Sequence, residues 1–338
     1  MFLWFSGLIL ASVFVYYTFR YIWESIPLSS VNKSRRAVFI TGCDTGFGRL
    51  LALKCARNGI PTYAGCLTKQ GEESLTEDSK DCREKVVTVP LDVTSDESVN
   101  AAARFVEKDI TNRNIQLWAL VNNAGIFTCY GPDAWTTIDD YKLAMEVNLY
   151  GVIRCTHAFL SLLKQSKGRI ISPSSVAGRI SIPGGGAYSC AKFAVEAYMD
   201  SIRLELRPFG ITCCILEPGV FRTNLTDNDQ MRNRVNRVWD KLSPEIKHEY
   251  GEKFKNQFID LWNSQVGDLA STRLDYVVDS YYHAITAMYP RLRYRCGWDS
   301  ILFYIPLSFL PTEFIDALFM QIAKGPLPMA LIAKGKSE

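Results

Sequence analysis

Short apolar runs alternate with amphipathic stretches along most of this chain, and this alternation constrains the fold more strongly than any other feature. A short apolar run bounded by turn residues is typical of a buried strand, and a helical apolar period is typical of a helix. We expect strands at 37–40, 61–66, 86–93, 117–121, 169–172, 211–216 and 292–296. We expect long helices at 95–112, 141–165 and 187–207. This order predicts an α/β fold, a doubly wound parallel sheet in a single domain.

The composition excludes several classes of function. The chain has 338 residues and a net charge of only +3, so no strong attraction to nucleic acid is expected. Its ten cysteines include no Cys-x-x-Cys pair, and its three histidines lack metal-ligand spacing, so we expect no metal site. Cys213 and Cys214 lie in an apparent strand, where cysteine is usually a small buried apolar residue. This pattern fits a reducing compartment.

The N-terminal residues predict attachment to a membrane. No charge occurs before Arg20, and the apolar run that closes near Trp23 is long enough to span a bilayer. Because the basic start of a secretory signal peptide is missing, we expect an uncleaved anchor over 1–23 and a polar linker over 24–35. Three basic residues follow the anchor: Lys33, Arg35 and Arg36. By the positive-inside rule, we expect the domain that follows the anchor to lie in the cytosol. We expect the membrane to be that of the endoplasmic reticulum. The alternative is a hydrophobic helix lying on the membrane surface.

The pattern changes after the last long strand. We expect the main domain to cover 36–300, and the polar, helical stretch within 225–290 to pack on the core or to cover a substrate as a lid. Its aromatic residues are spaced along one face: Trp239, Phe254, Phe258 and Trp262. The tail over 301–338 is apolar but interrupted by prolines, so it predicts a segment that touches a membrane or covers the lid.

Two motifs contain residues suited to binding a ligand or to transferring a proton. Gly42, Gly46 and Gly48 fall between a strand and a helix, where glycines let the backbone approach a pyrophosphate and the helix N-terminus offers free N–H groups. Tyr188 and Lys192 are four residues apart, so they share one face of a helix. A lysine ammonium beneath the phenol would lower its pKa from about 10 and let the tyrosine exchange a proton near neutral pH.

Together, these motifs resemble those of the short-chain dehydrogenase/reductases over roughly 36–225. The matching pieces are Thr41 to Gly48, Leu91-Asp92-Val93, Asn122 to Gly125, Asn148, Ser175, Tyr188 to Lys192 and Pro218-Gly219. The amino-acid sequence of the glycine loop is similar to that of the branch that contains the retinol, hydroxysteroid and 3-hydroxybutyrate dehydrogenases. The resemblance implies a Rossmann fold, a nicotinamide cofactor and a substrate with a CH–OH group.

The resemblance also implies roles for individual residues. The catalytic residues are Asn148, Ser175, Tyr188 and Lys192, with Asn148 interrupting its helix to hold a water and Ser175, rather than Ser174, binding the substrate oxygen. The cofactor-binding residues are Gly42, Thr45, Gly46, Phe47, Gly48, Asp92, Asn122, Ala124, Gly125, Tyr188, Lys192, Pro218, Gly219 and Thr223. For Asn122 a structural role is the alternative. Pro173 departs from the family pattern because it removes a backbone donor just before the serines.

The choice of cofactor rests on the end of the second strand. An acidic residue about 20 positions past the glycines favours NAD, and an arginine favours NADP. The window Cys66–Lys69 contains neither. We expect NAD, with NADP left open.

Three functions remain open. The anchor, the apolar tail and the aromatic face favour a lipophilic alcohol, either a retinoid or a hydroxysteroid, as substrate. A small hydroxy acid such as 3-hydroxybutyrate would need a cationic pocket. A non-enzymatic cofactor-binding scaffold is disfavoured by the intact catalytic set. We also expect a homodimer formed through the helices at 141–165 and 187–207.

Overall fold

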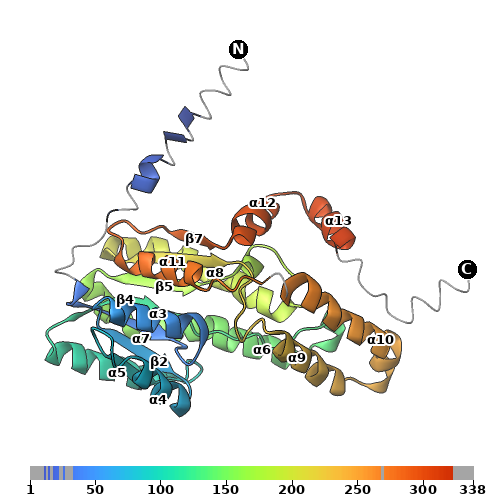
Figure 1. Ribbon diagram of the computed structural model, residues 1–338, viewed down its shortest axis with the longest axis horizontal. Coiled ribbons are helices and arrows are strands. Elements are labelled where there is room, and N and C mark those ends of the chain that lie inside the picture. The colour runs from blue at the N-terminus through green and yellow to red at the C-terminus, as the bar shows by residue number, and fades with distance from the viewer. Residues whose placement is uncertain are drawn as a thin grey trace, which may run out of the picture.

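A parallel sheet forms the centre of the molecule, with helices on both faces (Figure 1). The computed structural model describes residues 11–12, 14–15, 18–22, 26, 33–267 and 270–322. Within these residues the sheet has seven strands in the order β3-β2-β1-β4-β5-β6-β7, and all neighbours are parallel. The strands are β1 (Arg36–Thr41), β2 (Thr62–Cys66), β3 (Val86–Pro90), β4 (Gln116–Val121), β5 (Arg169–Pro173), β6 (Thr212–Pro218) and β7 (Arg293–Cys296). The predicted doubly wound sheet is confirmed.

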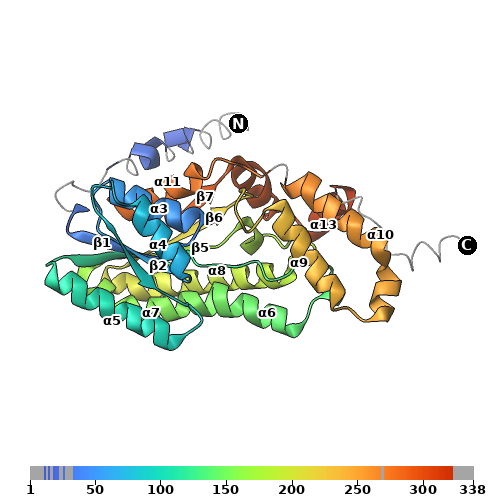
Figure 2. The ribbon, with the colours of Figure 1, turned by 60° about the horizontal axis from the view of Figure 1, so that its bottom comes forward.

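Helices cover both faces of the sheet (Figure 2), and an apolar core lies on each face. The helices are α3 (Gly46–Arg57), α4 (Lys69–Asp78), α5 (Asp96–Asn112), α6 (Ile138–Met145), α7 (Gly151–Ser166), α8 (Gly186–Leu206), α9 (Asn228–Asp240), α10 (Pro244–Trp262), α11 (Asp275–Thr286), α12 (Ile305–Leu307) and α13 (Thr312–Ile322). Helices α5, α7 and α8 bury apolar residues on one face, and α3 and α11 on the other. Since both faces are buried, the strands read as nearly continuous apolar runs.

Some element boundaries differ from the sequence-based expectation. The strand expected over 86–93 ends at Pro90, because the chain turns away there and Thr94 donates from its backbone to the Asp92 carboxylate at 2.9 Å. Helix α4 was not predicted. It buries only Gly71 and Leu75, which is too few apolar residues to make a periodic signal.

The helix expected over 141–165 starts earlier and is interrupted. A reciprocal cap between Thr137 and Asp140 begins α6 at Ile138. A π-helical turn, Glu146–Tyr150, then separates α6 from α7. Such turns often occur at functional positions, and this one contains Asn148.

The polar stretch after the sheet forms two helices. Helix α9 and helix α10 pack together, and α10 is kinked at Gly251, whose φ of 77° lies outside the helical region. Their buried residues join a third apolar cluster, which also contains Phe127 and Trp135 from the loop after β4. The predicted aromatic face is therefore a packed face, and its action as a lid stays a prediction.

Most of the expected anchor over 1–23 and linker over 24–35 lies outside the described residues. Residues 18–22 are helical, and Phe19 and Tyr21 are exposed. In the part of the chain that the structure describes, no helix has both the length and the apolar character needed to cross a membrane. Of the expected tail over 301–338, the structure describes residues 301–322, which include α12 and α13.

Candidate active site

The glycine loop brings the backbone close to the first turn of α3. Gly42 has a φ of +68°, and a Cβ on it would lie 2.8 Å from the Cα of Ala124, so the loop and the end of β4 can touch only through glycine. The N-cap residue Thr45 makes no side-chain capping bond, and the first turn of α3 has no acidic residue. The N–H groups of this turn are therefore available to an anion such as a phosphate.

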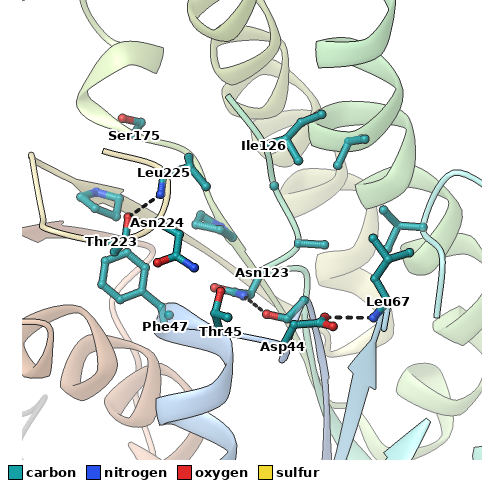
Figure 3. A pocket seen from close by; sticks show the side chains of 18 of the residues that line it. Asp44, Thr45, Phe47, Leu67, Asn123, Ile126, Ser175, Thr223, Asn224 and Leu225 are labelled. Atoms are coloured by element: carbon teal, nitrogen blue, oxygen red, sulfur yellow. Dashed lines mark hydrogen bonds between the residues drawn. The ribbon is translucent and has the colours of Figure 1, made fainter. Parts of the chain in front are cut away.

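A cleft of about 640 Å³ opens along the carboxyl ends of the strands, beside the point where the strand order reverses between β1 and β4 (Figure 3). Most of the predicted site residues line it. They are Gly42, Thr45, Gly46, Phe47, Asp92, Ala124, Gly125, Ser175, Tyr188, Lys192, Pro218, Gly219 and Thr223. Residues from the carboxyl ends of five strands and from helix α8 thus meet in one cavity, as the family order of the motifs implies.

Gly48, Asn122 and Asn148 do not line the cleft. A Cβ on Gly48 would lie 2.4 Å from the Nδ2 of Asn123, so this glycine lets helix and loop pack closely. The Asn122 amide is buried and donates to the hydroxyls of Thr156 and Ser172, which is a structural role. Its neighbour Asn123 lines the cleft instead and donates to the Gly42 carbonyl oxygen at 3.1 Å.

Asn148 holds the loop that follows β4. Its Oδ1 accepts from the Ile126 N–H at 2.8 Å, and its Nδ2 donates to the Ile126 carbonyl oxygen at 3.0 Å. A Cβ on Gly125 would lie 3.0 Å from the Asn148 Oδ1 and 3.9 Å from the Lys192 Nζ, so both side chains border Gly125. The π-helical turn aims this amide away from its own helix, and the predicted water stays a prediction.

Tyr188 and Lys192 share one face of α8, as their spacing predicts. The Lys192 Nζ lies 5.6 Å from the centroid of the Tyr188 ring and donates to the Pro173 carbonyl oxygen at 3.0 Å. Burial raises the pKa of Tyr188 to about 12, opposed by a hydrogen bond with Ser175. Burial also lowers the pKa of Lys192 to about 8, opposed by the nearby charge of Glu196. The expected lowering of the tyrosine pKa by the lysine is thus wrong for this structure, because desolvation raises the pKa and the influence that opposes it comes from Ser175.

The serines and Pro173 lie at the end of β5. The Ser174 hydroxyl donates to the Lys192 carbonyl oxygen at 3.2 Å, whereas the Ser175 hydroxyl accepts from the Ala177 N–H at 3.1 Å and lines the cleft beside Tyr188. Pro173 costs no bond in the sheet, because the pairing of β4 with β5 has already ended at Ile171. Its carbonyl oxygen instead accepts from Lys192.

Asp44 is a cleft residue that sequence reasoning missed. Its carboxylate reaches the end of β2 and accepts from the N–H groups of Leu67 and Thr68, each at 2.9 Å, and from the Thr68 hydroxyl at 2.6 Å (Figure 3). An acid that would bind the cofactor ribose was sought within the window Cys66–Lys69. Asp44 of the glycine loop places its carboxylate at the end of β2 instead, so this position carries a negative charge.

Aromatic rings pack against Tyr188; they are not among the residues that line the cleft, and we call them the aromatic wall. The Phe127 ring stacks on the Tyr188 ring with centroids 4.8 Å apart, and Trp262 of α10 meets Phe127 edge-on at 6.3 Å. Tyr130 packs against Trp262 and belongs to the same cluster. The neighbourhood of the tyrosine hydroxyl is thus apolar on the side of α9 and α10. Sequence reasoning had singled out Trp262 but not Phe127.

Comparison with known families decides what kind of protein carries this cleft. The family model for the short chain dehydrogenases matches residues 36–234, more than half of the chain. The chain belongs to the short-chain dehydrogenase/reductase family. It is therefore an oxidoreductase of the class that acts on CH–OH groups with a nicotinamide cofactor.

Curated relatives come from the predicted branch of the short-chain dehydrogenases. A 3beta-hydroxysteroid dehydrogenase of Caenorhabditis elegans is 45% identical over 331 residues, with 96% of this chain and 84% of that protein covered. Retinol dehydrogenase 7 of Rattus norvegicus is 43% identical, with 83% and 86% covered. The rat 17-beta-hydroxysteroid dehydrogenase type 6 is 39% identical, with 92% and 96% covered.

A solved structure supports the fold. The short chain dehydrogenase/reductase of Burkholderia phymatum, determined in complex with NAD, has a TM-score of 0.66 to this short-chain dehydrogenase at 21% identity. The match covers 88% of this chain and 98% of that one. This likeness supports the fold described above.

Proposed function

We propose that this enzyme oxidises a lipophilic alcohol, a retinoid or a hydroxysteroid, with NAD while attached to the endoplasmic reticulum membrane. The observation that carries the proposal is the position of Tyr188, whose ring borders the cleft beside Ser175 and Lys192 and stacks on Phe127. A proton-transferring hydroxyl between a cofactor cleft and an aromatic wall suits an alcohol that has a large apolar body. The names of the relatives support the same substrate class.

The cleft fits a nicotinamide dinucleotide. The uncapped first turn of α3 and the glycine loop would hold the pyrophosphate, and Asp92 would lie toward the adenine. Pro218, Gly219 and Thr223 would border the nicotinamide ring. These residues would hold the nicotinamide, which would supply the acceptor for the hydride that leaves the substrate carbon.

The residues of this chain would move the proton. Tyr188 would take the proton from the substrate hydroxyl as the hydride leaves, and return it in the reductive direction. Ser175 would donate a hydrogen bond to the substrate oxygen. Lys192, fixed by the Pro173 carbonyl, would stabilise the phenolate by its charge.

A small hydroxy acid remains the second candidate, and one observation weighs against it. Arg234 is the arginine near the aromatic wall, with its guanidinium carbon 5.8 Å from the Phe127 centroid. It donates to the backbone oxygens of Leu225 and Asn224, so two of its donors already have acceptors within the protein. A carboxylate substrate would have to compete for them.

A substrate screen tests the proposed function. Purified protein is supplied with NAD and, in turn, with all-trans-retinol, a 3-hydroxysteroid, a 17-hydroxysteroid and 3-hydroxybutyrate, and absorbance of the reduced cofactor is followed. We expect turnover with at least one retinoid or steroid and none with 3-hydroxybutyrate. The reverse pattern would contradict the substrate assignment but keep the enzyme class.

Cofactor preference gives a prediction for Asp44. We expect NAD to be preferred by a factor of tens, because the carboxylate at the end of β2 would repel a 2′-phosphate. Asp44→Asn should lower the NAD/NADP ratio of kcat/KM by about tenfold, since charged contacts contribute ~1.5–3 kcal/mol. Thr68→Arg should move the preference toward NADP. Glu73→Gln, an exposed change on α4, is the control. A wild-type preference for NADP of about tenfold or more would refute the assignment.

The anchor gives a second prediction. Deleting residues 1–23 should make the protein extractable from membranes by carbonate, because the apolar run precedes β1 and no strand depends on it. The truncated protein should still bind cofactor, which titration of its fluorescence would show. Carbonate-resistant association after the deletion would point to the C-terminal tail as the anchor. The homodimer through 141–165 and 187–207 stays a prediction that sedimentation would test.

A further inference from the structure

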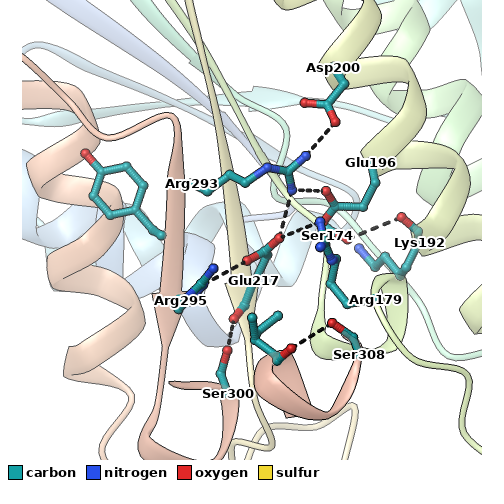
Figure 4. Close-up of polar contacts among 12 residues, drawn as sticks. Ser174, Arg179, Lys192, Glu196, Asp200, Glu217, Arg293, Arg295, Ser300 and Ser308 are labelled. Carbon is teal, nitrogen blue, oxygen red and sulfur yellow. Dashed lines mark hydrogen bonds and ion pairs between the residues drawn. The ribbon is translucent and has the colours of Figure 1, made fainter. Parts of the chain in front are cut away.

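Glu196 is a buried acid on helix α8 that the proposed reaction does not use. It lies one turn after Lys192, and the two residues are only 7% and 5% exposed. Since residues four apart share one face of a helix, the carboxylate and the ammonium lie on the same buried side of α8. Figure 4 shows both side chains next to Ser174 at the end of β5. A carboxylate is therefore kept in the protein interior beside the lysine of the cleft.

The contacts of Glu196 leave half of its carboxylate without a partner. Arg293 of β7 donates to the Oε2 atom (Figure 4). The Oε1 atom is buried and accepts no hydrogen bond from any residue that the structure describes. The same guanidinium also donates to Glu217 at 2.8 Å and to Asp200 at 2.6 Å, so Arg293 would keep two carboxylate partners without Glu196. Because a buried polar atom without a partner destabilises the fold, the ion pair alone does not explain an acid at this position.

The state of the Lys192 ammonium shows what this acid acts on. The lysine Nζ donates to a neutral group, the Pro173 carbonyl oxygen, at 3.0 Å. Burial lowers the pKa of Lys192 to about 8, and the charge of Glu196 opposes this fall. An opposite charge favours the charged form of a buried group. Without Glu196, the lysine would therefore lose its proton at a lower pH.

The other titratable groups of this region come from five elements. They are Tyr188 and Asp200 of α8, Arg179 after β5, Glu217 of β6, Arg293 and Arg295 of β7, and Tyr281 of α11. The two tyrosines are uncharged near neutral pH, because burial raises the pKa of each. The three arginines pair with Glu217 and Asp200. Glu196 is the charge that raises the pKa of Lys192.

We propose that Glu196 is a positioning residue whose carboxylate keeps the Lys192 ammonium charged beside Tyr188. Glu196 is not among the residues that line the cleft, so it acts through the lysine rather than on a substrate or cofactor. Arg293 holds the carboxylate in place from the edge strand. The need for a charged lysine in turnover rests on the proposed function, whereas the effect of Glu196 on the lysine does not.

Titration of Lys192 by nuclear magnetic resonance tests this effect without any turnover. Full-length protein in detergent micelles is isotopically labelled at the Cε atoms of its lysines, and the Lys192 signal is the one missing from Lys192→Arg. We expect a titration midpoint near pH 8 in the wild type. In Glu196→Gln the midpoint should fall by about one pH unit, the lower end of the ~1–3 that a close opposite charge contributes. An unchanged midpoint would overturn the proposal.

Matched variants separate the Glu196 charge from the ion pairs around it. Asp200→Asn removes another partner of Arg293 from the same helix, two turns beyond Lys192, so the Lys192 midpoint should stay near pH 8. Glu196→Gln keeps an oxygen that can accept from Arg293, so it should fold and bind cofactor. Glu196→Met removes the same charge with an apolar side chain, and the same fall is expected from it if the glutamine variant does not fold. Equal falls in Glu196→Gln and Asp200→Asn would assign the effect to the whole ion-pair cluster and refute a specific role of Glu196.

The pH dependence of turnover links the effect to the reaction. At pH 6 Lys192 is charged with or without Glu196, so Glu196→Gln should oxidise the alcohol about as fast as the wild type. At pH 9 the variant should be about tenfold slower, because a shift of one pH unit changes the charged fraction tenfold. A loss of the same size at both pH values would show a merely structural role and contradict the proposal. If no substrate is turned over but the Lys192 midpoint still falls, the proposed function fails and the effect of Glu196 on the lysine stands.

Discussion

Replacing Tyr188 with phenylalanine is expected to lower turnover by about 10²–10⁴-fold, the usual contribution of a general acid or base. The phenol hydroxyl is the group placed to exchange a proton at the cleft, beside Ser175 and Lys192. Phenylalanine keeps the ring and its stacking on Phe127 at a centroid distance of 4.8 Å, so the aromatic wall should persist. Cofactor affinity should change little.

Single-turnover rates with saturating cofactor measure this loss without interference from product release. Tyr198→Phe is the matched control, because it removes a buried hydroxyl from the same helix α8 outside the cleft. It should keep nearly full activity. If Tyr188→Phe retained more than about a tenth of the wild-type rate, another group would have to move the proton.

The pKa values explain why the tyrosine needs its surroundings. Burial raises the pKa of Tyr188 to about 12, so the phenolate is scarce near neutral pH without further stabilisation. Sequence reasoning predicted the opposite direction, because the spacing to Lys192 shows the cation but not the loss of water around the phenol. Desolvation depends on Phe127 and the cluster behind it, which come from distant parts of the chain.

The sheet could be predicted because its strands are short, apolar and separated by helices. The local hydrophobic pattern predicts the order of strands and helices. The family motifs predict which loops meet at the carboxyl ends of the strands. Helix α4 was not predicted because its ten mostly polar residues show little periodicity, and its N-cap Thr68 was considered only within the window searched for an acid or an arginine.

Asp44 and Asn122 show the limit of reading a site from motif positions. An acid was sought at the end of β2, and it comes instead from the loop after β1, a neighbour only in the folded sheet. Asn122 matched the motif, yet its side chain points to Thr156 and Ser172. A motif fixes where the backbone runs, while the direction of each side chain depends on packing.

A substitution outside the cleft, at Arg293 on β7, is expected to have a large effect on the free energy of unfolding. Its guanidinium forms ion pairs with Glu196 and Asp200 of α8 and with Glu217 of β6 (Figure 4). Glu217 is 1% exposed and Glu196 is also buried. The arginine therefore joins the helix that carries Tyr188 to the strand that leads into Pro218 and Gly219.

Arg293→Met should lower the free energy of unfolding by about 3 kcal/mol, because removing one partner of a buried ion pair leaves the other charge uncompensated. The loss is expected at the low end of the usual ~3–5 kcal/mol, since Arg179 and Arg295 remain within 3.7 and 4.0 Å of Glu217. Urea unfolding measures it. Arg113→Met, which breaks a half-exposed pair with Glu84, should cost under about 1 kcal/mol.

The pH dependence of that loss distinguishes buried charge from lost packing. Burial raises the pKa of Glu196 above its ordinary value, and Arg293 opposes the rise. In Arg293→Met the folded-state pKa should rise further, so folding favours the protonated carboxyl. An acid with a raised folded-state pKa destabilises the protein once the pH exceeds its unfolded-state pKa. The loss in free energy of unfolding caused by Arg293→Met should therefore be larger at pH 8 than at pH 5. A loss due to packing alone would be the same at both pH values.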